Sequence, residues 1–173
     1  MIRAFVAFKT IIRKIKMKKY IITFLFSVFA VLSVTAQSKT NPQLSKLYQN
    51  YISVKSALAS DDFKKTSVAA GEFLKTASSV NSKSLDAKKL NSLKSDAKTI
   101  SSAKDIDAQR KPFYRLSEVM IAVAKENKIS DKTIFVQYCP MAEGSWLSNE
   151  KQIVNPYYGS SMLKCGSVKS EIK

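Results

Sequence analysis

The chain of 173 residues contains no histidine. Histidine is the general base of Ser-His-Asp and Cys-His sites, so both kinds of nucleophilic catalysis are excluded. Type-1 copper sites and nearly all zinc sites also depend on imidazole ligands. No other acid/base constellation stands out in the sequence, and we expect that the protein is not an enzyme. Any metal site in this chain must rely mainly on sulfur.

Sulfur is also scarce, since the chain has two cysteines and five methionines. Both cysteines lie near the end of the chain, each close to a methionine, in the patterns Cys139-x-Met141 and Met162-x-x-Cys165. Thiolates and thioethers are soft ligands that suit Cu(I), and Ag(I) is bound by the same chemistry. The sequence therefore predicts Cys139, Met141, Met162 and Cys165 as candidate ligands of a soft metal ion. Another methionine, Met120, falls on a helical apolar stripe, and we interpret it as a core residue.

The first 36 residues have the pattern of an export signal. A basic start at Met17 is followed by an apolar stretch of about 15 residues, shorter than the roughly 20 that cross a bilayer. The stretch ends in a small residue, Ala36, after which we predict cleavage. Residues 1–16 add a second basic and apolar stretch upstream, so we predict Met17 as the true start. The mature chain would be residues 37–173, the length of one domain, with no stable membrane insertion.

Export into an oxidising compartment favours a second arrangement of the cysteines, a Cys139–Cys165 disulfide. It would close a loop of about 25 residues and contribute roughly 3 kcal/mol of stability. The local carboxylates, Glu143 and Glu150, are too few to make a convincing structural zinc site with two thiolates. Disulfide and metal site both remain open, because a reduced pair would bind Cu(I) and an oxidised pair would release it.

Acidic residues are few, with 13 against 29 basic ones. The first 36 residues hold seven basic residues and no acidic ones, which leaves 22 against 13 and a net charge of +9 in the mature chain. The lysines are spread singly and the arginines do not cluster. A nucleic-acid-binding surface would concentrate its charge, so we expect solvated helix faces and no nucleic-acid partner.

Glycine and proline, four of each, are rare between residues 41 and 128. Apolar residues recur there at helical spacing in four segments, which begin near Pro42, near Asp61 or Asp62, near Leu85, and near Asp105 or Asp107. Pro112 lies within the fourth segment and predicts a restart near Arg110 or a bend. Short connections between amphipathic helices predict a mainly α fold, an up-down antiparallel four-helix bundle over about residues 41–128.

Residues 129–173 differ in composition and complete the single domain that we predict for residues 37–173. Residues 133–138 are β-branched and aromatic, which predicts a short strand, and an irregular segment follows. Trp146, Tyr157 and Tyr158 are the aromatic residues available to pack this tail on the bundle or to contact a partner. Arg110 is a candidate to pair with Asp107 or Glu118, or to bond carbonyl groups of the tail.

Four blocks of the chain resemble an uncharacterised bacterial periplasmic domain family. They are YxxVKxALAxDD (51–62), DIxxQRxxFxxLS (105–117), YCPMA with WLSN (138–149), and IxNPYYGxxMLxCG (153–166). This family is found alone and fused to periplasmic adaptor subunits of copper/silver efflux systems. Its activity is undefined, so the resemblance implies no catalytic residues. Short metal-binding domains of related adaptors carry a histidine after Cys-Pro-Met, where this chain has Ala142.

The resemblance and the sulfur pattern together predict a soluble periplasmic protein. It would bind Cu(I) or Ag(I), and a periplasmic efflux adaptor would be its partner in heavy-metal efflux or tolerance. The alternative is a disulfide-stabilised periplasmic interaction module that binds no metal. Its contact surface would be the aromatic tail.

Overall fold

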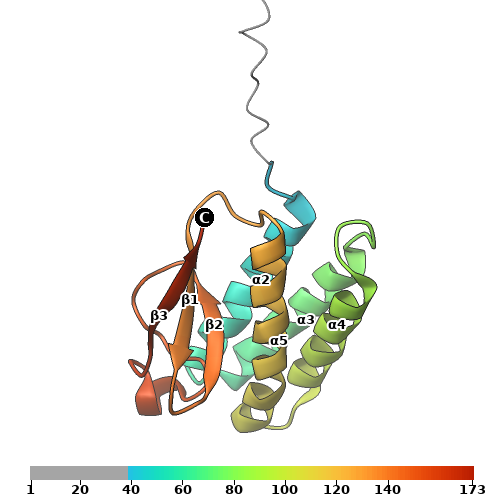
Figure 1. Cartoon of the computed structure of the whole chain (residues 1–173). Coiled ribbons are helices and arrows are strands. Elements are labelled where there is room, and N and C mark those ends of the chain that lie inside the picture. The colour runs from blue at the N-terminus through green and yellow to red at the C-terminus, as the bar shows by residue number, and fades with distance from the viewer. Residues whose placement is uncertain (1–38) are drawn as a thin grey trace, which may run out of the picture. The chain divides into compact units, whose positions relative to one another are not determined.

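Asparagine and aspartate side chains define where the helices begin. The computed structural model describes residues 39–173, and four α-helices follow one another in this range: α2 (Pro42–Ala59), α3 (Phe63–Ser79), α4 (Ala87–Ser102) and α5 (Ile106–Glu126) (Figure 1). Asn41, Asp62, Asp86 and Asp105 each precede a helix and accept hydrogen bonds from backbone N–H groups of its first turn. N-cap residues stabilise a helix start in this way. The four predicted helices are therefore confirmed.

Residues 39–173 form one compact unit. The predictions for the export signal, with a start at Met17 and cleavage after Ala36, lie outside the described residues. No helix between residues 39 and 173 has the length and apolar character needed to cross a membrane.

Pro112 lies inside α5, which continues through it to Glu126 without a restart. The predicted restart near Arg110 is therefore wrong. Proline has no N–H to donate to the carbonyl of Ala108, four residues earlier. Gln109 before the proline and Phe113 and Leu116 after it are buried, and this packing outweighs one missing hydrogen bond.

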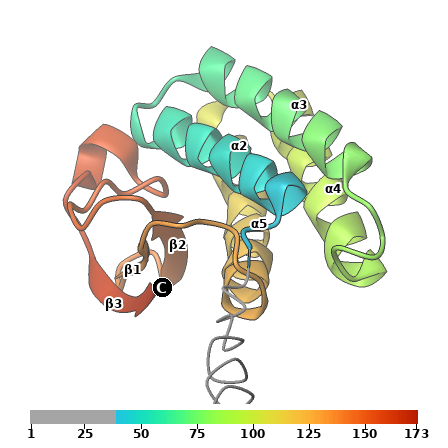
Figure 2. The ribbon, with the colours of Figure 1, turned by 90° about the horizontal axis from the view of Figure 1, so that it is seen from above.

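The helices pack as consecutive antiparallel neighbours (Figure 2). At one end of the bundle Gln43, at the start of α2, donates to the carbonyl of Ser79, at the end of α3, and Lys89 of α4 pairs with Glu126 of α5. At the other end Arg110 of α5 reaches the carbonyl of Leu58 in α2. These contacts place the start of one helix beside the end of another, as an up-down bundle requires. The predicted mainly α four-helix architecture is confirmed.

The tail forms a small antiparallel sheet. Its strands are β1 (Ile134–Cys139), β2 (Gly144–Ser148) and β3 (Ser167–Ile172), in the spatial order β2-β1-β3. Cys139 pairs with Gly144 across β1 and β2, and Gln137 pairs with Trp146. The prediction of a strand near residues 133–138 is confirmed by β1. The other two strands fall within the segment that we expected to be irregular.

Strand β2 attaches the sheet to the bundle (Figures 1 and 2). The Tyr51 hydroxyl of α2 accepts a hydrogen bond from the backbone N–H of Leu147 at 3.0 Å and lies 2.9 Å from the Ser117 hydroxyl of α5. The Tyr51 and Phe113 rings stack with centroids 5.5 Å apart, and Tyr157 of the tail lies 5.7 Å beyond Phe113. A buried aromatic row thus joins both helices to the tail, which orients the segment that carries the cysteines.

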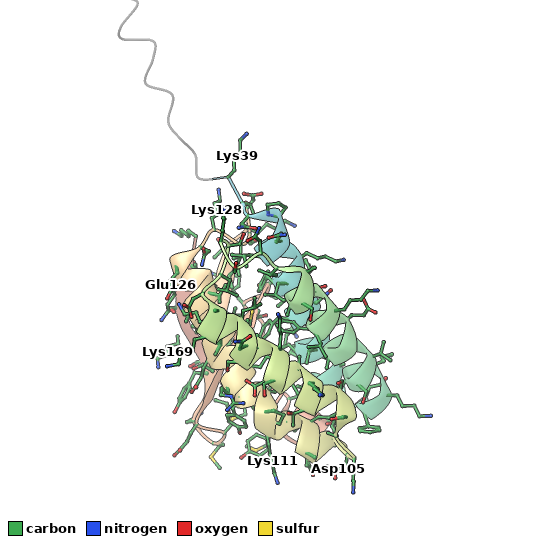
Figure 3. All side chains as sticks on the ribbon, turned by 90° about the vertical axis from the view of Figure 1, so that its right-hand side faces the viewer. Lys39, Asp105, Lys111, Glu126, Lys128 and Lys169 are labelled. Carbon is green, nitrogen blue, oxygen red and sulfur yellow. The ribbon has the colours of Figure 1, made fainter. Side chains whose placement is uncertain are left out.

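The charged side chains lie mainly on the outside of this unit. Figure 3 shows Lys39 and Lys128 near one end of the helices, and Asp105 and Lys111 near the other. Among the acidic residues between 39 and 173, Asp96 is the buried one, and it forms an ion pair with Arg115, whose Nε lies 2.9 and 3.0 Å from the two carboxylate oxygens.

Candidate functional site

The two cysteines lie at one end of the sheet, where the central strand β1 ends and the chain enters β3. Cys139 is the last residue of β1 and its side chain is fully buried, whereas Cys165 follows the short 3-10 helix η2 (Gly159–Met162) and is half-buried. Both are free, and they lie close enough for each thiol to shift the pKa of the other. The structure therefore brings together the two thiols that the sequence predicted as a metal site or a disulfide.

Several N–H groups are directed at the sulfur of Cys139. They belong to the backbone of Ala142 and Met141 and to the side chain of Asn155. Burial raises the pKa of the Cys139 thiol, but these hydrogen bonds and the one from Cys165 lower it more, so the pKa lies below its ordinary value. The same hydrogen bond to Cys139, together with burial, raises the pKa of the Cys165 thiol. The pair is asymmetric, with negative charge best accommodated on the buried sulfur.

A tight turn produces this arrangement. Residues 140–143 connect β1 to β2, and the N–H of Glu143 donates to the carbonyl of Pro140 at 3.3 Å. Glu143 has a φ of 50°, and this left-handed residue turns the chain so that Gly144 pairs with Cys139. The N–H groups of Met141 and Ala142 within this turn point back to Cys139. The Cys-Pro-Met-Ala motif thus forms a loop around its own thiol.

The predicted methionine ligands lie on the same two segments of the chain as the cysteines. Met141 is 63% exposed in the β1–β2 turn, and its carbonyl accepts the Tyr158 hydroxyl at 2.9 Å. Met162 is half-buried, and its carbonyl accepts the N–H of Cys165 at 2.9 Å. Met120 is fully buried in the core of α5, as predicted. Between residues 39 and 173, no group of three or more Cys, Asp or Glu side chains gathers in a way that could hold a metal ion.

The tail aromatics pack inward. Trp146 is fully buried and meets Tyr157 edge-on at 5.8 Å, and Tyr157 in turn stacks on Tyr114 of α5 at 4.0 Å. The Tyr157 hydroxyl donates to the carbonyl of Ser145 at 2.6 Å. Tyr158 is half-buried. Trp146 and Tyr157 therefore join the tail to the bundle.

Trp146 also lies next to the thiol pair. A Cβ on Gly166 would come within 3.0 Å of its ring, so the indole touches the backbone that follows Cys165. It is the only tryptophan in the chain. Its fluorescence is therefore a local reporter of the sulfur site.

Asn155 is a site residue that the sequence indicated only as part of a turn. It is fully buried, and its Nδ2 donates to the carbonyl of Cys165 at 3.0 Å as well as lying against the thiol of Cys139. Its Oδ1 accepts the N–H of Tyr157 at 2.8 Å. One amide side chain therefore contacts both cysteine-bearing segments. The Asn-Pro pair in the sequence favoured a turn, but nothing in it indicated contact with sulfur.

A second cluster fixes the tail at the α2–α3 corner. Arg110 of α5 donates to the carbonyl of Pro156 at 3.2 Å and to Asp107 at 3.0 Å, and it forms an ion pair with Asp61. Two of the alternatives predicted for Arg110 are thus both present, the pair with Asp107 and the bond to a carbonyl group of the tail. Asp61 also accepts the N–H of Ser160 at 2.8 Å. The role of Asp61 was missed, because the sequence marks it as a helix cap, and Asp62 is the residue that caps α3.

Replacing Asp61 with asparagine is expected to destabilise the protein by roughly 1–3 kcal/mol at pH 7, the range for hydrogen bonds to a charged group. Hydrogen bonds from Ser160, together with Arg110, hold the pKa of Asp61 below its ordinary value despite some burial. A lowered carboxyl pKa stabilises the fold above the unfolded-state pKa of about 4, and this contribution is lost as the pH falls through the folded-state pKa. Urea unfolding at pH 7 and pH 3 should show the gap between the two proteins shrinking at pH 3. A gap of unchanged size would contradict this account of Asp61.

The fold and the site define a helical domain with a small sheet, at one end of which two free cysteines lie on neighbouring segments. Residues 47–132 match the model of a family described as "Protein of unknown function (DUF3347)". The match covers most of α2 and all of α3, α4 and α5, and it ends before Cys139. It is therefore narrower than the resemblance drawn from the sequence, which extended to residue 166. Comparisons with curated proteins and with solved structures found no match.

Proposed function

We propose that the protein binds a soft monovalent metal ion, Cu(I) or Ag(I), through the thiolates of Cys139 and Cys165. Met141 and Met162 would supply additional thioether ligands. The observation that carries the proposal is that the fold brings the segments of the two cysteines together: Tyr138, next to Cys139, pairs with Ser167, and a Cβ on Gly166, next to Cys165, would come within 2.8 Å of the Tyr138 carbonyl. N–H donors of Met141, Ala142 and Asn155 lower the pKa of the buried thiol. A metal-bound thiolate carries negative charge, which such donors stabilise.

The donor set favours a soft metal over zinc. Cu(I) accepts as few as two sulfur ligands, whereas structural zinc requires four ligands, usually from cysteine and histidine. The nearby carboxylates, Glu143 and Glu150, are exposed, and the chain has no histidine. Two thiols with two flanking thioethers therefore fit Cu(I) or Ag(I) best.

The geometry also supports exchange of the metal with a partner. Cys139 is buried, whereas Cys165 is half-buried and Met141 is largely exposed. A metal ion held here would be bound by the buried sulfur of Cys139, and a partner would reach it from the side of Cys165 and Met141. We propose that the protein acts in the periplasm after export and exchanges metal with an efflux adaptor. The predicted export signal and the family resemblance are the support for the compartment and the partner.

We expect the reduced protein to bind one Cu(I) per chain in competition with a chromophoric Cu(I) chelator. Quenching of Trp146 fluorescence should follow the same titration, because the indole lies beside Cys165. The matched control is the same protein after oxidation of its thiols, which should leave the chelator complex intact. Retention of all the Cu(I) by the chelator in the presence of the reduced protein would reject the proposal.

The alternative is a structural disulfide in an interaction module without metal binding. The same proximity of Cys139 and Cys165 favours it, since a disulfide requires two thiols on neighbouring segments. The titration separates the two functions. Only a metal-binding protein removes Cu(I) from the chelator when it is reduced.

A further inference from the structure

Three residues from distant parts of the chain converge beside the thiol-bearing tail. They are Asp61 at the end of α2, Arg110 in the first half of α5, and Gly159 at the start of η2. A Cβ on Gly159 would overlap the carboxylate of Asp61 and the guanidinium of Arg110, so the tail backbone lies directly against this ion pair. We refer to Asp61 and Arg110 as the latch.

Asp61 occupies a position that normally favours glycine. Its φ is 56°, and the N–H groups of Asp61 and Asp62 donate to the carbonyls of Leu58 and Ala57 at 3.2 and 3.1 Å. This is the Schellman pattern of a helix C-terminus, in which the left-handed residue is usually glycine because a side chain there is strained. A residue kept at such a cost is expected to use its side chain. Here that side chain binds Arg110 and Ser160.

Arg110 is well placed to bind the tail. Its side chain is only 11% exposed, and its guanidinium donates to the carbonyls of Leu58 and Pro156 in addition to the carboxylates of Asp61 and Asp107. One planar group thus joins the end of α2, the start of α5 and the tail. Lysine carries the same charge but lacks this fork of donors, so it would not reproduce these contacts.

Two short paths lead from the latch to the sulfur pair. Along the first, Arg110 holds Pro156, and the adjacent Asn155 contacts Cys139 and the carbonyl of Cys165. Along the second, Asp61 holds the N–H of Ser160 in η2, the short helix that ends at Met162, whose carbonyl binds the N–H of Cys165. Cys139 is held separately by the sheet.

We propose that the latch positions Cys165 and Met162 against Cys139, and so sets the affinity of the sulfur pair from outside it. Asp61 and Arg110 are positioning residues in this proposal, since neither touches a thiol. The latch would position the two thiols in the same way whether they bind a metal ion or form a disulfide. Its consequence for metal affinity rests on the proposed function above.

The test measures how readily Cys139 and Cys165 form a disulfide. In glutathione buffers, two molecules of glutathione reduce the protein disulfide to two thiols and are converted to one molecule of glutathione disulfide, so the equilibrium constant reports how well the thiols are held together. Arg110→Lys and Asp61→Asn are expected to weaken the protein disulfide about tenfold or more. Cu(I) affinity, measured with the chelator, should fall in the same variants.

Arg115→Lys is the matched control. Arg115 also lies on α5 and pairs with an aspartate, Asp96, but that pair faces α4 and not the tail. It should lower stability without changing the disulfide equilibrium. Circular dichroism establishes that each variant is folded. Asp61→Asn keeps the test valid if Arg110→Lys does not fold, because asparagine has the same shape as aspartate and its oxygen still accepts the N–H of Ser160.

The possible outcomes separate the two proposals. An unchanged disulfide equilibrium in folded Asp61→Asn, or an equal loss in Arg115→Lys, would overturn the positioning role. Loss of disulfide stability in the latch variants alone supports it, even if the unaltered protein binds no Cu(I). In that case the proposed function fails and the positioning role stands.

Discussion

Replacing either Cys139 or Cys165 with serine should abolish tight Cu(I) binding and lower the affinity by more than about a hundredfold. Removal of a residue that only hydrogen-bonds a metal ligand costs about 10- to 100-fold in metal affinity, and a thiolate ligand contributes more than such a residue. Serine keeps the size of the side chain but has a hard oxygen that Cu(I) binds poorly. Chelator competition under reducing conditions measures the change directly.

The methionines provide the controls for this experiment. Met141→Leu and Met162→Leu should each weaken Cu(I) binding less than loss of a thiol, by about tenfold, because thioethers are neutral ligands. Met120→Leu removes the same chemical group from the buried core of α5 and should leave the affinity unchanged. Cu(I) binding that survived in both Cys139→Ser and Cys165→Ser would place the metal elsewhere. If Met120→Leu lost as much Cu(I) affinity as Met162→Leu, the loss would follow from a less stable fold and not from a missing ligand.

Replacing Gly159 with alanine should destabilise the protein by roughly 3 kcal/mol or more. The residue has a φ of 55°, where an alanine side chain is strained, and the added Cβ would overlap the Asp61–Arg110 pair. The tail backbone would have to move away from the helices. Urea unfolding followed by circular dichroism should show the loss, and the disulfide equilibrium of the cysteines should weaken with it.

Gly71→Ala is the matched substitution with the opposite expected sign. Gly71 lies within α3, and nothing is found within 4 Å of the position that its Cβ would take. Alanine there should stabilise the protein by about 1 kcal/mol, because it favours the helix without any clash. Equal effects at the two glycines would contradict the close approach of Gly159 to the latch.

The helices could be predicted because their determinants are local. Helical spacing of apolar residues and aspartate or asparagine at each start act within a few residues of one another. Strands β2 and β3 could not be predicted in this way. Strand β3 is polar and exposed along most of its length, and β2 begins with glycine and serine, so neither has the alternating apolar pattern of a half-buried strand. Their pairing with β1 depends on tertiary contacts.

The chemistry of the candidate site was determined by the sequence alone. In a chain without histidine, two cysteines that each have a neighbouring methionine predict soft-metal binding or a disulfide. Only the tertiary structure decided that the segments of Cys139 and Cys165 lie side by side, that Asn155 binds the carbonyl of Cys165, and that Asp61, Arg110 and Gly159 meet beside them. The reason is physical. Residue type determines which bonds a side chain can form, whereas contact between distant segments depends on how the helices and the sheet pack.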